Sequence, residues 1–489
     1  MQRLSGILLH PTSLPNKFGC GSFGKEAYDF LDILESNGQK IWQILPLGPT
    51  DETASPYQSY SAFAGNILLI DLEILQNDGL LSEIEECDFN DEKLEYKLVY
   101  DFHIKALKSA FLNFTPTHDS QLFFKKNKFW LDDYAFFAAL NEHFHGVYFV
   151  NWPKNIRNRE TQTLQKYSEI LKNEIEFHKF CQFQFFKQYK NLANYAKSKN
   201  IKIIGDIPIY VSANSVEAWV NRELFELDAT CKPKKVAGVP PDYFSQTGQR
   251  WGNPVYKWKN HKANNYAWWI ERLRFNLELF DIVRIDHFRA FEAFWSIPAS
   301  EETAINGKWV KGPNEEIFEA FTKAFGKNLP IIAEDLGIIT PAVEKLRDDF
   351  GLPGMKILEF GFGSGAGNSY LPHNFNQNCI VYTGTHDNDT LSGWLNEIKT
   401  NNHYAYKHLC DYLQKEEGDE LEFDIIKLAI SSTAKMAIFP MQDILKLDTN
   451  SRMNIPGTIT GNWLWRMSYN QMKNRGFEKL KKLCEIYGR

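Results

Sequence analysis

Short apolar segments recur along the chain, and each ends in polar residues or in glycine and proline. They cover residues 40–49, 201–211, 280–288, 329–337, 355–362, 379–389 and 436–445. Continuous apolar runs of this length are typical of strands in a parallel sheet that is covered on both faces. Amphipathic stretches separate them, and we expect helices over 315–326 and 340–351, the second beginning at a threonine cap followed by proline. Alternating strands and helices predict an α/β protein.

The acidic residues at the ends of these runs indicate which kind of α/β protein this is. They are Asp206, Asp286, Glu334, Asp387 and Asp443. An open, doubly wound sheet concentrates its site at one switch point, whereas a barrel assembles its site from the carboxyl ends of several strands. Five acidic strand ends therefore favour a (β/α)8 TIM barrel with inserted, largely helical subdomains.

Two long excursions interrupt the strand–helix alternation. We expect a mostly helical insertion over 66–178, which includes a phenylalanine-rich helical segment at 131–144, and a second insertion over 212–270. The second insertion carries a structureless loop at 238–256, in which aromatic residues alternate with proline and glycine, as in lids and binding loops. Residues 1–489 would then form a single catalytic barrel with two insertions.

Composition and charge exclude several classes of protein. Charged residues make up 24% of the 489 residues and the formal net charge is −6, which argues against a nucleic-acid partner. No run of 18 apolar residues occurs, and the first residues do not form a signal peptide, so we expect no membrane partner. The seven cysteines are scattered without a C-x-x-C pair, which predicts reduced thiols and a cytoplasmic location.

One glycine-rich segment looks like a nucleotide-binding motif but lacks its context. Residues 361–366 (GFGSGA) match a loose G-x-G-x-x-G/A pattern after a strand. A proline follows where the phosphate-binding helix should begin, so we do not expect nucleotide binding.

Asp286, Glu334 and Asp387 each follow an apolar run by one or two residues, so we expect them to converge in the barrel mouth. Converging carboxylates cost stability and usually indicate a metal site or acid/base chemistry. His287 and His386 flank the cluster, which keeps a divalent metal open as an alternative at this point. In the acid/base interpretation, Arg284 lies on the same strand face as Asp286 and keeps it ionised as a nucleophile. Glu334 has no adjacent cation, so burial should raise its pKa, as a general acid requires.

Longer motifs carry a resemblance that covers nearly the whole chain. RIDHFRA (284–290), AEDLG (333–337) and TGTHDND (383–389) resemble the catalytic strand ends of the 4-α-glucanotransferases, the amylomaltases or disproportionating enzymes of glycoside hydrolase family 77. These enzymes are relatives of the α-amylases. The further matching segments are 6–15, 42–50, 55–66, 205–211, 238–256 and 454–467, in family order.

The resemblance implies a function and a role for each matching residue. Asp286 would be the nucleophile, Glu334 the acid/base and Asp387 the stabiliser of the transition state. The substrate-binding residues would be Arg284, His287, His386, Asp206, Tyr57, Tyr243 and Phe244, the last two shielding the intermediate from water. The reaction implied is the transfer of α-1,4-glucan segments between malto-oligosaccharides, with retention and with neither cofactor nor metal. The alternatives are an α-1,4-glucan hydrolase with the same trio and a non-catalytic glycan-binding protein.

Overall fold

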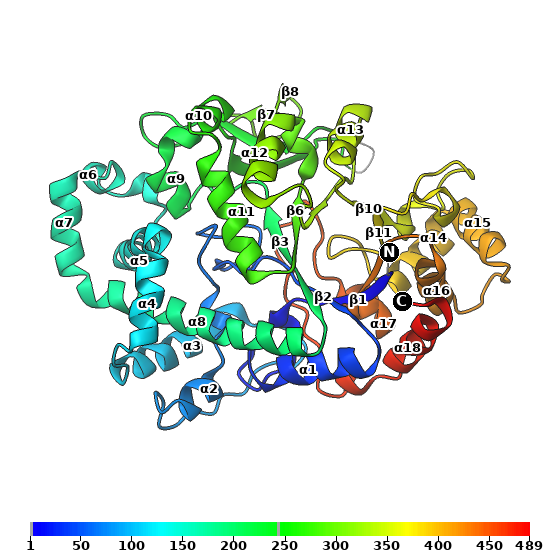
Figure 1. Cartoon of the computed structure of the whole chain (residues 1–489), viewed down its shortest axis with the longest axis horizontal. Coiled ribbons are helices and arrows are strands. Elements are labelled where there is room, and N and C mark those ends of the chain that lie inside the picture. The colour runs from blue at the N-terminus through cyan, green and yellow to red at the C-terminus, as the bar shows by residue number, and fades with distance from the viewer. Residues whose placement is uncertain (1–2, 242–244) are drawn as a thin grey trace.

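A barrel of eight parallel strands forms the centre of the molecule (Figure 1). The structure is a computed structural model and describes residues 3–241 and 245–489. Around the barrel the strands are β1 (Leu4–Leu8), β2 (Ile41–Gln43), β3 (Lys202–Pro208), β6 (Ile282–Asp286), β9 (Ile331–Ala333), β10 (Gly354–Ile357), β11 (Cys379–Tyr382) and β12 (Met436–Pro440). Parallel pairing joins each neighbour from β10 round to β9. The remaining seam is bridged where the Ala333 amide donates to the Pro353 carbonyl over 3.0 Å. The predicted barrel is confirmed.

Each of the seven apolar runs includes most or all of one barrel strand. The eighth strand, β1, was not among these runs. β1 has the sequence LSGIL, in which Ser5 and Gly6 interrupt the apolar run. A Cβ at Gly6 would lie 2.4 Å from the Cβ of Ile41 on β2, so this position has no room for a side chain. Close packing between β1 and β2 therefore requires a glycine that weakens the strand signal.

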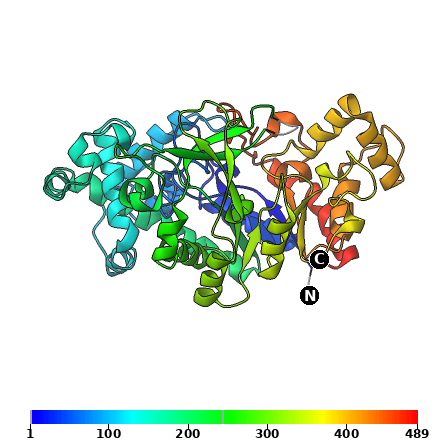
Figure 2. The ribbon, with the colours of Figure 1, turned by 90° about the horizontal axis from the view of Figure 1, so that it is seen from above.

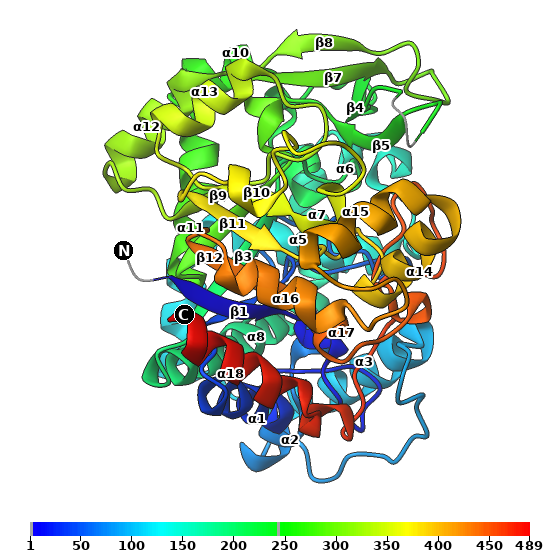
Figure 3. The same cartoon turned by 90° about the vertical axis from the view of Figure 1, so that its right-hand side faces the viewer.

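Helices cover the outside of the barrel. They include α1 (Lys25–Ser36), α11 (Ala267–Leu279), α12 (Glu315–Phe325), α13 (Pro341–Asp349), α16 (Glu422–Ser431) and α18 (Gly476–Tyr487). The helices expected over 315–326 and 340–351 are α12 and α13, and α13 begins with Thr340 at the N-cap and a proline in the first turn. α16 packs on β12, and α18 packs on α16 (Figure 3).

A group of helices between β2 and β3 extends to one side of the barrel, coloured from blue through cyan to blue-green in Figures 1 and 2. They are α2 (Leu72–Asn77), α3 (Tyr96–Leu112), α4 (His118–Lys126), α5 (Lys128–His143), α6 (Lys154–Arg157), α7 (Thr161–Ile170) and α8 (Lys172–Ser198). The helical segment expected at 131–144 is α5. A separate aromatic core holds this region together, including Trp130, Phe137, Trp152 and Trp219. Much of the aromatic content is therefore structural.

A second, four-stranded antiparallel sheet lies above the barrel in Figure 3 and was not expected from the sequence. Its order is β5 (Gln249–Pro254), β4 (Lys235–Val239), β7 (Ala293–Pro298) and β8 (Lys308–Lys311). The expectation of a structureless loop at 238–256 is wrong in part, because β4 ends and β5 lies within it. Its Tyr256 is a core residue: the ring is buried and the hydroxyl donates to the Ile209 carbonyl over 2.7 Å.

Shorter elements complete the chain. The remaining α-helices are α9 (Val216–Val220), α10 (Trp258–Ala263), α14 (Leu391–Asn401), α15 (His403–Leu413) and α17 (Met441–Ile444). Short 3-10 helices span Pro11–Ser13, Ile67–Leu69, Phe149–Asn151, Arg222–Leu224, Phe288–Phe291, Leu358–Phe360, Pro372–Asn374, Thr449–Ser451 and Gln471–Lys473. Within the described ranges, none of the helices combines the length and apolar character needed to cross a membrane.

Candidate active site

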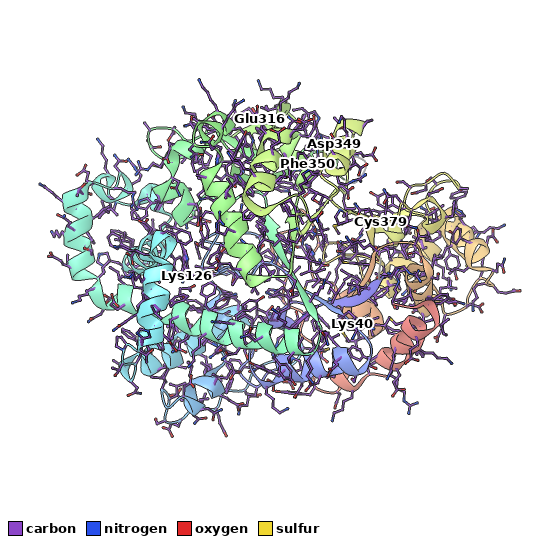
Figure 4. All side chains as sticks on the ribbon, in the orientation of Figure 1. Lys40, Lys126, Glu316, Asp349, Phe350 and Cys379 are labelled. Atoms are coloured by element: carbon purple, nitrogen blue, oxygen red, sulfur yellow. The ribbon has the colours of Figure 1, made fainter. Side chains whose placement is uncertain are left out.

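The predicted site residues that the structure describes lie at one end of the barrel. Lys40 and Cys379, labelled in Figure 4, mark the N-terminal ends of β2 and β11. The carboxylates lie at the opposite ends of their strands: Asp286 is the last residue of β6, and Glu334 directly follows β9. β3 and β6 pair so that Asp206 stands beside Arg284. The parallel register thus gathers residues that are far apart in the sequence.

Arg284 links two of the carboxylates. Its Nη1 lies 2.6 Å from Oδ2 of Asp206 and its Nη2 lies 2.9 Å from Oδ1 of Asp286. Only 3% of the arginine side chain is exposed, against 27% of the Asp286 side chain. A buried guanidinium needs such partners, because an unpaired buried charge is costly. The same Oδ2 of Asp206 accepts a hydrogen bond from the Tyr57 hydroxyl over 2.8 Å.

Glu334 is held by two backbone amides. Oε2 accepts from the amide of His287 over 2.6 Å, and Oε1 accepts from the amide of Leu336 over 2.9 Å. His287 has a φ of 55°, the left-handed conformation that most residues avoid. Such a conformation persists only where its surroundings enforce it, and it occurs often at functional sites. Here it accompanies the bond that fixes the glutamate at the end of the neighbouring strand.

Burial changes the acidity of both carboxyls. Burial raises the pKa of Glu334 to about 7, against the opposing effect of Arg284. Burial also raises the pKa of Asp286 well above its ordinary value, again opposed by Arg284, while Glu334 raises it further. The expectation that Arg284 keeps Asp286 ionised is therefore incomplete, because burial and Glu334 oppose the effect of the cation. Two interacting carboxyls can share one proton over a range of pH, and direct contact with Arg284 favours the negative charge on Asp286.

Asp387 lies in the loop after β11, several residues beyond the strand end, so its expected place one or two residues past the strand is wrong. Its Oδ1 accepts from Nδ2 of Asn454 over 2.6 Å and lies 3.5 Å from Nε2 of His386. Arg452 donates to the Asp387 backbone carbonyl over 2.6 Å. The Asp387 side chain is 44% exposed, so this carboxylate is the most open of the three to an incoming ligand.

Aromatic rings form one wall of the site. The Tyr57 ring stacks on His386 with centroids 5.2 Å apart and planes at 17°, and Trp463 leans against both rings at 5.7 Å. Trp251 meets His287 edge to face at 4.7 Å. Burial lowers the pKa of His386, and it lowers that of His287 to about 3. Both imidazoles are therefore neutral near pH 7 and suited to hydrogen-bonding hydroxyl groups.

Some polar atoms of the site have no partner within the described part of the chain. Oδ1 of Asp206 and Nε2 of His287 are buried and form no hydrogen bond there. Buried polar atoms without partners are rare and ask for an explanation. A bound ligand rich in hydroxyl groups would supply the missing partners.

The structure brings together eight of the ten predicted site residues: Asp286, Glu334, Asp387, Arg284, His287, His386, Asp206 and Tyr57. Tyr243 and Phe244 lie outside the described residues. Over ranges 3–241 and 245–489, no three His, Cys, Asp or Glu side chains are placed to share a metal ion.

Three residues that lie beside the site were assigned no site role from the sequence: Trp251, which belongs to the expected aromatic loop, Asn454 and Trp463. All three stand inside motifs that carried the family resemblance, 238–256 and 454–467. Position in such a motif was the available signal, but nothing in the sequence indicated which of its residues reach the carboxylates.

The chain matches known proteins in both sequence and structure. The family model described as 4-alpha-glucanotransferase matches residues 9–472. A 4-alpha-glucanotransferase of Clostridium butyricum is 45% identical over 98% of this chain and 100% of its own length. The structure of an amylomaltase from Streptococcus agalactiae in complex with acarbose matches with a TM-score of 0.96 and 39% identity over all of both chains. An amylomaltase from Corynebacterium glutamicum, 16% identical over 98% of this chain and 75% of its own, shares the fold with a TM-score of 0.79.

Proposed function

The chain belongs to the 4-alpha-glucanotransferase family, and from this premise we propose that Asp286, Glu334 and Asp387 transfer α-1,4-glucan segments by a double displacement. It is an enzyme with the 4-alpha-glucanotransferase activity of that family, and a hydrolase is not favoured. The observation that carries the residue assignment is the pairing at the ends of β6 and β9. There an aspartate contacts a buried arginine, and a buried glutamate has its pKa raised to about 7.

In the first step an ionised Asp286 oxygen attacks C1 of a glucose unit of the donor. The bond from C1 to the bridging oxygen breaks, and Glu334 gives its proton to that oxygen as the leaving segment departs. A covalent ester between Asp286 and the donor segment remains. Asp387, on the open side of the site, would accept hydrogen bonds from sugar hydroxyls and stabilise the positive charge that develops on the ring.

In the second step Glu334, now ionised, takes the proton of an acceptor 4-hydroxyl. The acceptor oxygen attacks C1, the ester bond to Asp286 breaks, and a new α-1,4 linkage forms with net retention. Transfer requires that a sugar reaches the ester before water does. Positioning of the acceptor and exclusion of solvent favour that outcome.

Binding roles follow from the contacts. The neutral His287 and His386 and the free oxygen of Asp206 would hydrogen-bond the sugar, while Tyr57 supports His386 by stacking. Malto-oligosaccharides and α-1,4-glucans, as in starch and glycogen metabolism, are the substrates we propose. We also propose one catalytic barrel over 1–489 with insertions at 66–178 and 212–270, and a cytoplasmic location consistent with seven free cysteines.

The decisive experiment uses maltotriose as the only carbohydrate. A transferase releases glucose and builds longer oligosaccharides while the number of reducing ends stays constant. A hydrolase raises the number of reducing ends with every turnover. Asp286→Asn serves as the inactive control, since it removes the nucleophile but keeps the shape of the side chain. An increase in reducing ends equal to the glucose released would overturn the proposed transfer, and a wild-type rate in Asp286→Asn would overturn the residue assignment.

A further inference from the structure

The loop after β11 carries both His386 and Asp387, and one buried carboxylate outside the site bonds both of its ends. Asp443, in the first turn of α17 after β12, is 2% exposed. Its Oδ2 accepts from the Thr383 hydroxyl over 2.5 Å, and its Oδ1 accepts from the Leu391 amide over 2.8 Å. Thr383 directly follows β11, and Leu391 is the first residue of α14. The side chain of Asp443 thus joins the two ends of the loop.

Within the loop, other bonds fix its shape but not its place on the barrel. Oδ1 of Asn388 accepts from the amide and the hydroxyl of Thr385, over 3.0 and 2.8 Å. The Thr385 hydroxyl in turn accepts from the Asp387 amide over 3.3 Å. These contacts form a compact turn that includes Asp387.

Packing behind the loop is incomplete. A cavity of about 30 Å³ lies there, with His386, Asn388 and Asp443 among its lining residues. A segment with unfilled space behind it has fewer packing contacts on that side, so its hydrogen bonds contribute more to its position. Besides the bonds to Asp443, the Asp387 carbonyl accepts from Arg452, and the Asp387 carboxylate accepts from Asn454. The Thr449 hydroxyl donates to Asp389, and the Glu359 amide donates to the Thr383 carbonyl over 3.3 Å, so each of these bonds reaches a single point of the loop. Asp443 is the anchor that reaches both ends.

We propose that Asp443 is a positioning residue for glucan transfer: by bonding Thr383 and Leu391, it holds the loop so that Asp387 and His386 face the reacting sugar. This inference rests on the proposed function, in which Asp387 stabilises the transition state. Because Asp443 acts through the loop, its loss should reduce the rate of the chemical step more than the binding of the donor. A shift of about 1 Å at a catalytic group can cost on the order of 100-fold in rate.

The test compares Asp443→Asn, Thr383→Val, Thr383→Ser and the double variant Asp443→Asn/Thr383→Val, with kcat and KM measured on maltotriose. We expect the first two to lower kcat by roughly 10- to 100-fold with little change in KM. Thr383→Ser keeps the hydroxyl and should restore most of the rate. The double variant should be no slower than the slower single variant, since each change removes the bond that the Thr383 hydroxyl donates to a carboxylate.

Asp71→Asn is the matched control. Asp71 is also buried, and its carboxylate accepts from one hydroxyl, that of Ser22 over 2.7 Å, and one amide, that of Ile74 over 2.9 Å. Asp71 caps α2 and does not contact the catalytic loop. The Asp71→Asn variant should therefore be less stable than the wild type but have an unchanged kcat. Equal kcat values for Asp443→Asn and Asp71→Asn, or losses that multiply in the double variant, would overturn the inference.

Two further outcomes keep the test decisive. If Asp443→Asn does not fold, Thr383→Val and Thr383→Ser still decide, because a rate that does not depend on the hydroxyl contradicts the anchor. Asp387→Asn, measured alongside, separates the two proposals. A wild-type rate in that variant would refute the role of Asp387 itself, whereas an inactive Asp387→Asn beside a normal Asp443→Asn would refute only the anchor.

Discussion

Arg284 and Asp286 are two residues apart on β6, and Nη2 of the arginine lies 2.9 Å from Oδ1 of the aspartate. The cation lowers the pKa of Asp286 and that of Glu334, while burial raises both. The first chemical step needs Asp286 ionised and Glu334 protonated, so activity should fall at low pH through Asp286 and at high pH through Glu334.

Arg284→Gln should move both limbs of the pH profile of kcat/KM to higher pH. Removing the cation raises the pKa of each carboxyl, so Asp286 ionises later and Glu334 also keeps its proton longer. Arg284→Lys is the matched control, because it retains the charge and should shift the limbs less, although it loses the two-pronged contact. Limbs that stay in place in Arg284→Gln would show that the arginine does not set these acidities.

Glu334→Gln should lose activity with natural glucans but still react with a donor that has a good leaving group. An α-maltosyl fluoride needs no protonation to leave, so the ester with Asp286 should still form and be visible by mass spectrometry of the intact protein. Asp286→Asn is the control that should form no ester with either donor. Failure of Glu334→Gln to form the ester from the fluoride would contradict an acid role for Glu334.

The same substitution should change how stability depends on pH. The folded protein holds the Glu334 proton up to about pH 7, whereas the ordinary pKa is 4.5. Between these values the unfolded chain has already released a proton that the folded chain still binds, so the free energy of unfolding falls as pH rises. The window corresponds to at most about 3 kcal/mol, less any sharing of the proton with Asp286.

Glutamine does not titrate, so the melting temperature of Glu334→Gln relative to the wild type should increase from pH 5 to pH 8. Any constant effect of the amide on packing cancels in this comparison. Thermal unfolding of both proteins across the pH range provides the measurement. A difference in melting temperature that does not change with pH would mean that burial does not raise the pKa of Glu334 in the folded protein.

The barrel could be predicted from the sequence because its strands are short, apolar and buried on both faces, as in IIA of β9 or CIVY of β11. The positions of the carboxylates at the ends of β6 and β9 could be predicted from the same pattern. A charged residue directly after a buried barrel strand lies at the mouth of the barrel. The small antiparallel sheet was missed because β8, with the sequence KWVK, is mostly exposed and bounded by lysines, so it lacks the apolar run of a buried strand. β4 and β5 were not predicted because they contain or adjoin glycine and proline residues, which are uncommon in strands.

Tertiary contacts account for the details that the sequence could not give. Asp387 is held by Asn454, which is far from it in the sequence, and no local pattern links the two. The pKa of Asp286 depends on how deeply the side chain is buried and on Glu334, which follows another strand. Neither can be predicted from the local sequence RIDHF. The anchoring of Thr383 and Leu391 by Asp443 likewise exists only once β11 and β12 lie side by side.

Tyr243 and Phe244, which lie outside the described residues, carry the remaining sequence-based prediction. Replacing both with alanine should reduce transfer more than hydrolysis. Water is small and concentrated and reaches the ester without help, whereas a sugar acceptor must be held by stacking and hydrogen bonds. Ring stacking contributes on the order of 1 kcal/mol beyond buried area, so the ratio of transfer to hydrolysis should fall several-fold.

The control for this ratio is a double variant at two exposed aromatic residues on other elements, Phe129→Ala and Tyr404→Ala, whose side chains belong to α5 and α15. Both variants are assayed with maltotriose, with glucose counting total turnover and new reducing ends counting hydrolysis. If the two loop aromatics only stabilise the fold, both reactions decrease together and the ratio matches that of the control. A ratio that drops only in the Tyr243→Ala/Phe244→Ala variant means that these rings favour the acceptor over water, because a loss of folded enzyme scales both products equally and cannot change their proportion.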